Sequence, residues 1–328
     1  MKKIDCVTIG GATRDIIFKT DDYSFNLEDK KELYMCFSYG QKIIPSETHF
    51  TFGGGALNSA VSMSRLGLNV SSIINAGNHE ASSSLVRKMK DEKIDTKMIM
   101  TSNKKNDYRG ITVLLVDKGK DHTAILYRGT NDKIMIKDWS FLNKTDWIYV
   151  TSLTGDSDKC LNSLEDKINK SGVKFAWNPG SVQLKKGYSG LKKLIKMTDV
   201  FILNKEEAEN LACSKNKNLS CTLGDVTSEI KSWGAKAVVV TDGSNGAQVA
   251  FDGELVRVKS YPAKVSDTTG AGDAFGSTFV AGIIMGMSHE NALKLASINS
   301  ASVVSYFGAQ EGLLKKADIL KKLKNYKQ

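Results

Sequence analysis

The sequence predicts an α/β fold: a doubly wound, mostly parallel sheet flanked by helices, with a small β-sheet lid inserted in the N-terminal half. Short apolar runs alternate with amphipathic segments, which favours a sheet covered by helices on both faces. The hydrophobic fraction of 41% over 328 residues is enough to bury a full core. Two polar, β-prone stretches interrupt the alternation. We expect residues 1–328 to form a single α/β domain.

The strands are predicted from continuous apolar runs, which are typical of strands buried on both faces. These runs cover residues 6–9, 70–76, 147–151, 173–177, 200–203 and 237–241. Helices are expected where apolar residues recur at helical spacing, at residues 58–66, 82–90, 161–170, 191–197 and 205–211. Strand and helix therefore alternate along most of the chain.

The lid is predicted from the two interruptions, at about residues 16–51 and 98–127. The second has the pattern of a hairpin, YRGITVLLV and HTAILYRG around the polar turn DKGKD. We expect the two stretches to pair over the carboxyl edge of the main sheet, where open α/β sheets bind ligands. Such a sheet has open edges, so we also expect that two protomers can pair their lids as a homodimer.

A net charge of +10 could indicate a protein that binds nucleic acid, but the distribution of the charge argues against such binding. The chain has 46 Lys plus Arg and 36 Asp plus Glu, and only six of the basic residues are arginine. Arginine is the residue that grips phosphates bidentately and reads bases. The lysines are spread out, and their densest run, KKADILKKLKNYKQ, is typical of a solvated helix face. We predict no nucleic-acid partner.

The remaining composition favours a cytoplasmic protein without a metal cluster. No apolar run approaches the roughly 20 residues that a membrane span needs. The five cysteines are odd in number and show no C-x-x-C spacing, which argues against a disulfide framework or a zinc site and favours a reducing compartment. The four histidines lie far apart and form no paired motif, so we expect no histidine-based metal site.

The most informative stretch is VSDTTGAGDAFGSTFVAGIIMG, residues 265–286, in which a glycine-rich turn opens a helix expected at residues 274–287. Gly270 and Gly272 allow the backbone to come close to a ligand. The first N–H groups of a helix lack internal partners and lie at the positive end of its dipole. Such a turn is typical of an anion site, above all one for phosphate.

Asp273 stands inside this turn, and two interpretations are open on the residues alone. A carboxylate in the first helical turn commonly caps the helix or interacts with its dipole. Beside a bound phosphate it would instead suit a base that accepts the proton of an attacking hydroxyl. A Walker A loop is absent, and Phe275 stands where a dinucleotide fingerprint needs its third glycine.

Two motifs together resemble the ribokinase-like sugar and nucleoside kinases, the phosphofructokinase B-type family. DTTGAGDAF is similar to the family's D-T-x-G-A-G-D signature, and GGGALN followed by RLG is similar to its G-G-x-x-x-N signature. The likeness covers nearly the whole chain. It implies a ribokinase-like fold and an alcohol-acceptor phosphotransferase that uses ATP and Mg²⁺ to phosphorylate a small sugar or nucleoside.

The resemblance also implies roles for single residues. Asp273 would be the catalytic base, with Gly270, Ala271 and Gly272 as the anion hole. The positions similar to the family's substrate-binding residues are Asp15, Gly54, Gly55 and Asn58. Those similar to its nucleotide-binding residues are Asn204, Glu207, Thr241, Gly243, Gly246 and Asn299.

The same resemblance implies two metal-binding roles. Glu207 would bind magnesium through a water molecule, and Asp267 would bind a monovalent cation such as K⁺. On the residues alone, Asp15 and Asn58 could instead be turn or helix caps. Asn204 and Glu207 would form a capping box, a role that is compatible with the magnesium one.

Some residues depart from the family pattern and leave the acceptor open. FAWNPG, residues 175–180, lacks the arginine that often follows it in the family, and the stretch between Asp15 and Gly53 is long. Tyr127 and Arg128 resemble a pair that some acid-sugar kinases use. Aromatic residues that could stack on a nucleoside base lie in the expected lid: Phe18, Tyr23, Phe25, Tyr34 and Phe37.

An ATP-dependent kinase of a small sugar or sugar derivative is the leading hypothesis. A nucleoside kinase of the adenosine type is the alternative within the enzyme class. A non-catalytic nucleotide- or sugar-binding protein and a polyanion-binding scaffold are the alternatives outside it; the first would bind ATP without turnover, and the second would bind nucleic acid in a salt-dependent way.

Overall fold

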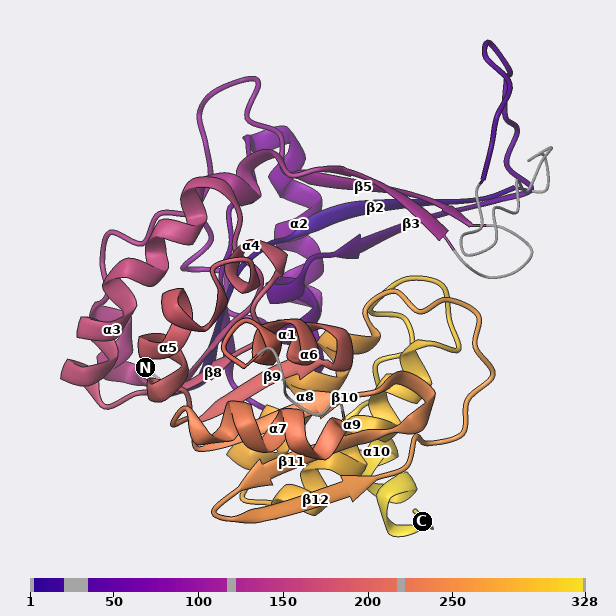
Figure 1. Ribbon diagram of the computed structural model, residues 1–328. Coiled ribbons are helices and arrows are strands. Elements are labelled where there is room, and N and C mark those ends of the chain that lie inside the picture. The colour runs from indigo at the N-terminus through magenta and orange to yellow at the C-terminus, as the bar shows by residue number, and fades with distance from the viewer. Residues whose placement is uncertain (1–2, 21–34, 117–121, 217–221, 327–328) are drawn as a thin grey trace.

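The computed structural model describes residues 3–20, 35–116, 122–216 and 222–326, which form two sheets and two helical layers (Figure 1). Sheet A is the central sheet, in the order β12-β11-β10-β9-β8-β7-β1-β4. Its strands are β1 (Ile4–Ile9), β4 (Val70–Ile73), β7 (Thr145–Val150), β8 (Lys174–Trp177), β9 (Val200–Asn204), β10 (Ala237–Thr241), β11 (Ala247–Phe251) and β12 (Glu254–Val258).

Sheet A is parallel from β4 to β10, as the apolar runs predicted, and antiparallel at β11 and β12. The sequence analysis did not predict this last pair. Phe251 pairs with Glu254 across a two-residue turn in which Asp252 and Gly253 both have positive φ. Asp-Gly between two β-prone runs is a strong hairpin signal, so the pair was predictable from residues 247–258.

Helices cover both faces of sheet A. One layer contains α1 (Gly55–Arg65), α2 (His79–Asp91), α8 (Ala271–Ile284), α9 (His289–Val303) and α10 (Lys316–Lys324), and the other contains α3 (Cys160–Ser171), α5 (Gly187–Met197), α6 (Lys205–Cys213) and α7 (Leu223–Ser232). Short helical turns complete the chain: α4 (Ser181–Leu184), η1 (Gly129–Lys133), η2 (Ser140–Lys144), η3 (Gly155–Lys159) and η4 (Gly243–Asn245).

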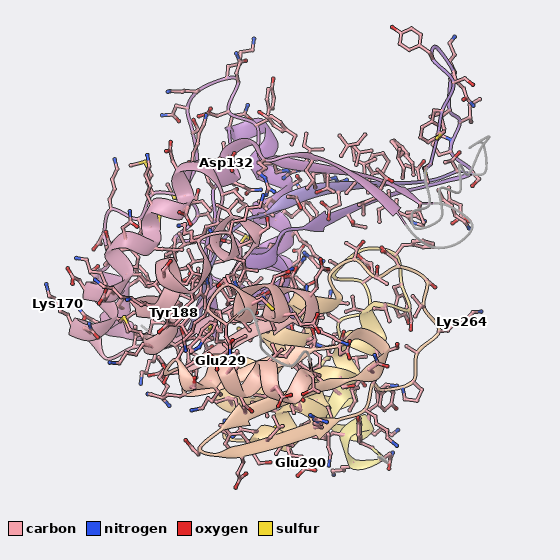
Figure 2. All side chains as sticks on the ribbon, viewed as in Figure 1. Asp132, Lys170, Tyr188, Glu229, Lys264 and Glu290 are labelled. Atoms are coloured by element: carbon pink, nitrogen blue, oxygen red, sulfur yellow. The ribbon has the colours of Figure 1, made fainter. Side chains whose placement is uncertain are left out.

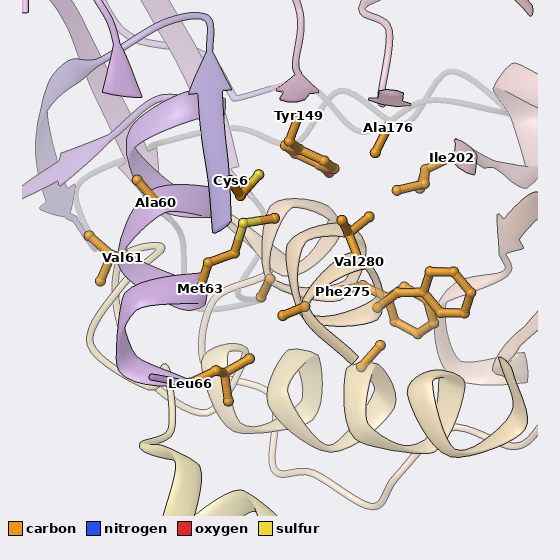
Figure 3. Close-up of a cluster of buried hydrophobic side chains, with 14 of the residues drawn as sticks. Cys6, Ala60, Val61, Met63, Leu66, Tyr149, Ala176, Ile202, Phe275 and Val280 are labelled. Carbon is orange, nitrogen blue, oxygen red and sulfur yellow. The ribbon is translucent and has the colours of Figure 1, made fainter. Parts of the chain in front are cut away.

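Successive residues of a strand enter different cores, because side chains alternate across a sheet. Tyr149 belongs to the core under α1 and α8, whereas its neighbours Ile148 and Val150 belong to the core under α3 and α5. Figure 3 shows the first core, where Met63 of α1 and Val280 of α8 pack on the strands. The two helices that carry the predicted site residues are therefore fixed to the same face of sheet A.

Sheet B is small and has the order β3-β2-β5-β6, from β2 (Thr13–Lys19), β3 (Glu47–Gly53), β5 (Gly110–Val116) and β6 (His122–Tyr127). It extends from the main body above the segment that precedes α10 (Figure 1). Strands β2 and β5 pair directly, so the two N-terminal interruptions meet as predicted. The first strand begins at Thr13, three residues before the expected bound, and the DKGKD turn lies outside the described residues.

The surface carries its positive charge in scattered positions. Lys170 and Lys264 lie at opposite edges of the molecule (Figure 2). The lysine-rich C-terminal run forms α10, which buries Ile319 and leaves Lys321 and Lys322 exposed. None of the helices in the described part of the chain is long and apolar enough to span a membrane.

Candidate active site

The glycine turn lies where the predicted motif placed it, at the start of α8. Gly270 is the N-cap residue with φ 78°, and a Cβ atom there would overlap with Ala309, so only glycine fits. The helix begins at Ala271, three residues earlier than expected. The N–H of Ala271 donates to the carbonyl of Thr268 over 3.2 Å, whereas those of Gly270, Gly272 and Asp273 have no hydrogen-bond partner among the described residues. These three groups remain available to an anion.

Asp273 lies in the first turn of α8, half-buried. Burial raises the pKa of its carboxyl, the bond from Asn58 opposes this shift, and the nearby charge of Asp15 adds to it. Oδ2 of Asp273 accepts a hydrogen bond from Nδ2 of Asn58 over 2.8 Å. Asn58 is 4% exposed and stands on α1. A carboxylate with a raised pKa beside free N–H groups has the properties of a base at an anion site.

Asp15 stands on β2 and is 4% exposed. Its Oδ1 accepts a hydrogen bond from Oγ1 of Thr13 over 2.7 Å, and burial raises the pKa of its carboxyl. A Cβ atom on Gly53 would overlap with this carboxylate, which explains one glycine of the GGG turn. Gly54 has φ 95°, and a Cβ there would lie 2.5 Å from the carbonyl oxygen of Gly11. The turn is thus shaped by close backbone approach.

Gly55, the remaining substrate-site residue expected from the sequence, is the first residue of α1, where a Cβ atom would lie 2.8 Å from Thr151. The structure brings Asp15, Asn58 and Asp273 together, because Asn58 bonds Asp273 and Asp15 acts on its pKa. One strand and two helices that are separate in sequence therefore present polar groups at one position.

Asp267 is 2% exposed and joins two loops. Its Oδ1 accepts from the N–H of Thr269, and its Oδ2 accepts from the N–H of Gly308, both over 2.9 Å. The carboxylate therefore fastens the turn before α8 to the segment after α9. Each of its oxygens has a second lone pair, so the donor set is compatible with a cation.

Two cavities adjoin at the start of α8, and the smaller one reaches Asp273. The larger, of about 510 Å³, is lined by residues of the η4 turn, the 260–265 segment, α8 and α9. The smaller, of about 250 Å³, is lined by Asn204, Glu207 and Asp273 among others. Both cavities share the wall residues Thr241, Thr268, Ala271 and Gly272. Gly243 and Gly246, expected from the resemblance to bind nucleotide, lie in the wall of the larger cavity.

Asn204 and Glu207 form a capping box at the start of α6. Oδ1 of Asn204 accepts from the N–H of Glu207 over 2.8 Å, and Oε2 of Glu207 accepts from the N–H of Asn204 over 2.9 Å. Burial raises the pKa of the Glu207 carboxyl. The structural role that the residues alone suggested is present, at the wall of the smaller cavity.

Asn299 differs from the position expected for it. It is fully buried, its Nδ2 donates to Thr278 and its Oδ1 accepts from the N–H of Leu314, and it does not line the larger cavity. The cavity is lined instead by another face of α9, formed by Ser297, Ser300, Ala301 and Val304. Residues three, four and seven apart share a helix face, so Asn299 lies on a different face of α9 from the one that lines the cavity.

The sequence analysis missed several wall residues. Tyr261, Pro262 and Phe275 line the larger cavity, and Asn178 of the FAWNPG segment lines the smaller one. No pattern in SYPA, residues 260–263, distinguishes it from an ordinary loop. Asn178 stands directly after β8, at the edge where parallel strands end, and that position could have identified it.

The lid residues that were considered for acceptor binding differ in exposure. Tyr127 is 51% exposed, and Arg128 is exposed beside it. Phe18 and Phe37 are half-buried. Tyr23, Phe25 and Tyr34 lie outside the described residues.

Comparison with known proteins places the chain in a family. The sequence model of the pfkB family of carbohydrate kinases matches residues 3–316. An ATP-dependent 6-phosphofructokinase of Thermoanaerobacterium thermosaccharolyticum is 27% identical over 318 residues, which cover 94% of this chain and 90% of that protein.

Two solved structures share the fold. Ribokinase of Arabidopsis thaliana, complexed with ribose and ATP, has a TM-score of 0.79 at 21% identity and matches 99% of each chain. The nucleoside kinase of Burkholderia thailandensis, in complex with inosine, has a TM-score of 0.77 at 18% identity and matches 98% of this chain and 100% of that one. With the family model matching nearly its whole length, the chain belongs to the pfkB family of carbohydrate kinases, which phosphorylate sugar hydroxyl groups.

Proposed function

We propose that the protein transfers the γ-phosphoryl group of ATP to a hydroxyl of a small sugar or sugar derivative. One observation carries this proposal: the Asp273 carboxylate lies beside the free N–H groups of Gly270, Gly272 and Asp273, at the wall of the smaller cavity, which adjoins the larger one. On the other side of that carboxylate stands Asn58. An anion site and an acceptor site thus meet at a single base.

The nucleotide would occupy both cavities. The apolar wall of the larger cavity, with Tyr261, Phe275 and Val304, suits the adenosine end. The smaller cavity leads from Thr241 to Gly272 and Asp273 and suits the phosphates. In place of Asn299, we propose that Ser297 and Ser300 contact the adenosine end.

The chemistry needs one bond made and one broken. The acceptor oxygen bonds to the γ-phosphorus as the bond from that phosphorus to the bridging oxygen of ADP breaks, and the hydroxyl proton passes to Asp273. The N–H groups of Gly270, Gly272 and Asp273 would stabilise the negative charge of the phosphoryl oxygens. Asn58 and Asp15 would orient the acceptor hydroxyls.

Magnesium fits this site as an ion carried by the nucleotide. Mg²⁺ usually keeps several waters and takes one or two carboxylates together with phosphate oxygens. No three His, Cys, Asp or Glu side chains of the described residues converge as an all-protein metal site would need. Glu207 would hold the ion through water, and the bound ion would neutralise phosphate charge. The K⁺ ion at Asp267 stays a prediction, tested by comparing turnover in K⁺ and Na⁺ buffers.

The acceptor is proposed to be uncharged near its reacting hydroxyl. Asp15 and Asp273 are close enough that the charge of Asp15 raises the pKa of Asp273. A phosphate or carboxylate placed between them would be repelled. The position of exposed Arg128 gives no support to a carboxylated acceptor.

A nucleoside acceptor is the second candidate, and Leu126 favours it. Leu126 pairs with Thr112, and Thr112 pairs with Asp15, so all three side chains lie on the same face of sheet B. Leu126 is 57% exposed. An exposed apolar side chain on the acceptor face could pack against a base.

The experiment is ADP release from ATP with a panel of ribose, fructose, adenosine, inosine and fructose 6-phosphate. Turnover of one neutral acceptor, lost in Asp273→Asn, supports the proposal. Tight ATP binding with no turnover on the panel would favour a non-catalytic binder. Salt-dependent retention on nucleic acid would favour the polyanion scaffold.

We also propose that two protomers pair through the outer face of sheet B. Phe50, Ile125 and Tyr127 share this face and are 51–61% exposed. Sedimentation tests this proposal: we expect the wild-type protein to be a dimer and the Phe50→Asp variant to be a monomer.

The four cysteines in the described part have free thiols, which supports the predicted reducing, cytoplasmic location.

A further inference from the structure

A line of side-chain amides leads from the C-terminal segment to Asp273. Nε2 of Gln310 donates to Oδ1 of Asn58 over 2.9 Å, and Nδ2 of Asn58 donates to Oδ2 of Asp273 over 2.8 Å. Gln310 is 2% exposed and Asn58 is 4% exposed. The bond between the two amides is therefore buried, and the bond to Asp273 is partly buried at the wall of the smaller cavity. Hydrogen bonds are stronger in such surroundings than in water.

The charge of Asp273 determines the direction of both bonds. An ionised carboxylate only accepts hydrogen bonds, so Asn58 must turn its NH₂ group toward Asp273. Its oxygen then faces Gln310, which must in turn present its own NH₂ group. The second N–H of Asn58 remains for an acceptor hydroxyl. A glutamine far along the chain thus supplies the donor that this orientation of Asn58 requires.

Gln310 adopts this orientation at a cost. Its Oε1 is buried and has no hydrogen-bond partner among the described residues. An unsatisfied buried acceptor costs about 1–3 kcal/mol. A glutamine present only for packing would be expected to satisfy both ends of its amide, whereas this one satisfies only the end that faces Asn58.

Arg65 holds the backbone of Gln310 in place. Its NH1 donates to the carbonyls of Gln310 and Leu313, both over 2.8 Å, while Nε and NH2 bond Glu92 over 2.9 and 2.6 Å. Arg65 and Asn58 stand on the same helix, two turns apart. The segment that carries Gln310 is therefore fixed to the helix that carries Asn58.

We propose that Gln310 is a positioning residue that, through Asn58, keeps the Asp273 carboxylate oriented and ionised for proton abstraction. This inference rests on the proposed function only for its catalytic consequence. Other titratable groups around the carboxylate are Asp15 from β2, the neutral Tyr149 hydroxyl from β7 and Glu207 across the smaller cavity. The hydrogen bond from Asn58, which Gln310 holds in turn, opposes the effect of burial on the pKa of Asp273.

The test compares two substitutions at residue 310 with a matched control. Gln310→Met keeps the length of the side chain and removes its donor. Gln310→Glu replaces the donor by a carboxylate, which would draw the NH₂ group of Asn58 away from Asp273. Gln248→Met is the control: Gln248 is fully buried on β11, accepts from Nε of Arg257 over 2.8 Å and lines neither cavity.

We expect both substitutions at residue 310 to move the acid limb of the kcat/KM profile to higher pH, Gln310→Glu further than Gln310→Met. At neutral pH kcat should fall by roughly tenfold to a hundredfold, the scale of a misplaced catalytic group, with the KM for ATP unchanged. Gln248→Met should lower Tm and leave the acid limb in place. The pKa of the Asp273 carboxyl, followed by ¹³C NMR and assigned with Asp273→Asn, should rise in both 310 variants.

The two readouts separate this inference from the proposed function. In one outcome the enzyme is active, but the acid limb and the titration of the Asp273 carboxyl do not change in either 310 variant. This result would overturn the positioning role of Gln310 and leave the proposed function standing. In the other outcome the protein shows no kinase activity, but the titration of the Asp273 carboxyl still shifts in the 310 variants. This result would refute the proposed function and support the effect of Gln310 on Asp273 through Asn58. Should Gln310→Met fail to fold, Gln310→Glu alone decides through the same titration.

Discussion

Nδ2 of Asn58 lies 2.8 Å from Oδ2 of Asp273, although 215 residues separate them in the chain. The bond joins the two sequence motifs, one on α1 and one on α8, in a single contact. It places a neutral donor on one side of the carboxylate.

Replacing Asp273 by asparagine removes the base and keeps the shape of the site. ATP binding should be retained, because the N–H groups of the turn remain. Turnover should fall by roughly a hundredfold to ten-thousandfold, the scale of general-base catalysis. Single-turnover kinetics with calorimetry of ATP binding measure both. Full turnover in this variant would show that another group takes the proton.

The raised pKa of Asp273 predicts the pH dependence of both activity and stability. The base must be ionised, so kcat/KM should fall as pH decreases through a value above that of an ordinary aspartate. Keeping this carboxyl ionised disfavours the folded state, so Asp273→Asn should raise Tm at neutral pH. The gain should vanish at acid pH, where the wild-type carboxyl is protonated. Thermal unfolding across pH checks this, and a gain that is equal at all pH values would contradict it.

Gly270 and Gly272 should respond differently to alanine. Gly270 has φ 78° and no room for a Cβ, so Gly270→Ala should cost at least about 1–2 kcal/mol of stability. A Cβ on Gly272 meets no atom within 4 Å, so Gly272→Ala should fold with equal or greater stability. Its methyl group would point into the phosphate position, and turnover should fall by about a hundredfold or more. Chemical denaturation and steady-state kinetics measure the pair; unimpaired turnover in Gly272→Ala would remove the anion hole from this turn.

Glu207→Gln separates capping from metal binding. A glutamine oxygen can still accept from the N–H of Asn204, so the capping box and Tm should be preserved. The lost charge should raise the Mg²⁺ concentration for half-maximal turnover by roughly tenfold to a hundredfold, the scale for groups that hold a metal's own ligands. Magnesium titration of turnover is the measurement. A lowered Tm with an unchanged magnesium requirement would leave Glu207 a structural residue.

The Arg65–Glu92 pair predicts acid sensitivity. Burial alone would raise the pKa of Glu92, but hydrogen bonds from Arg65 and Lys88 hold it at about 2, below the ordinary 4.5. Its stabilisation is therefore present above pH 4.5 and lost as pH falls toward 2, and it is worth roughly 1–2 kcal/mol once solvent screening is allowed for. Urea unfolding of wild type and Glu92→Gln should differ at neutral pH and converge in acid. A difference that does not change with pH would contradict this.

Local signals predicted most of the fold and part of the site. The apolar runs located the parallel strands, and the DTTGAGDAF motif located Asp273 in the first turn of a helix. Asn299, expected at the nucleotide site, is buried on a face of α9 that does not line the larger cavity, because one residue of register moves a side chain to another face.

The contacts that complete the site could not be read from spacing. Gln310 and Asn58 are 252 residues apart, and nothing in the local pattern of either residue points to the other. Arg65 was visible as part of the RLG motif, but its partners are backbone carbonyls, which carry no side-chain signature.

The attachment of Gln310 and Leu313 to Arg65 has a consequence for protein synthesis. A growing chain that has already made its glycine turn, both cavities and Asp273 still lacks the amide that orients Asn58. A nascent chain on the ribosome would therefore stay catalytically immature until the stretch around residue 313 has emerged and docked on the first helix.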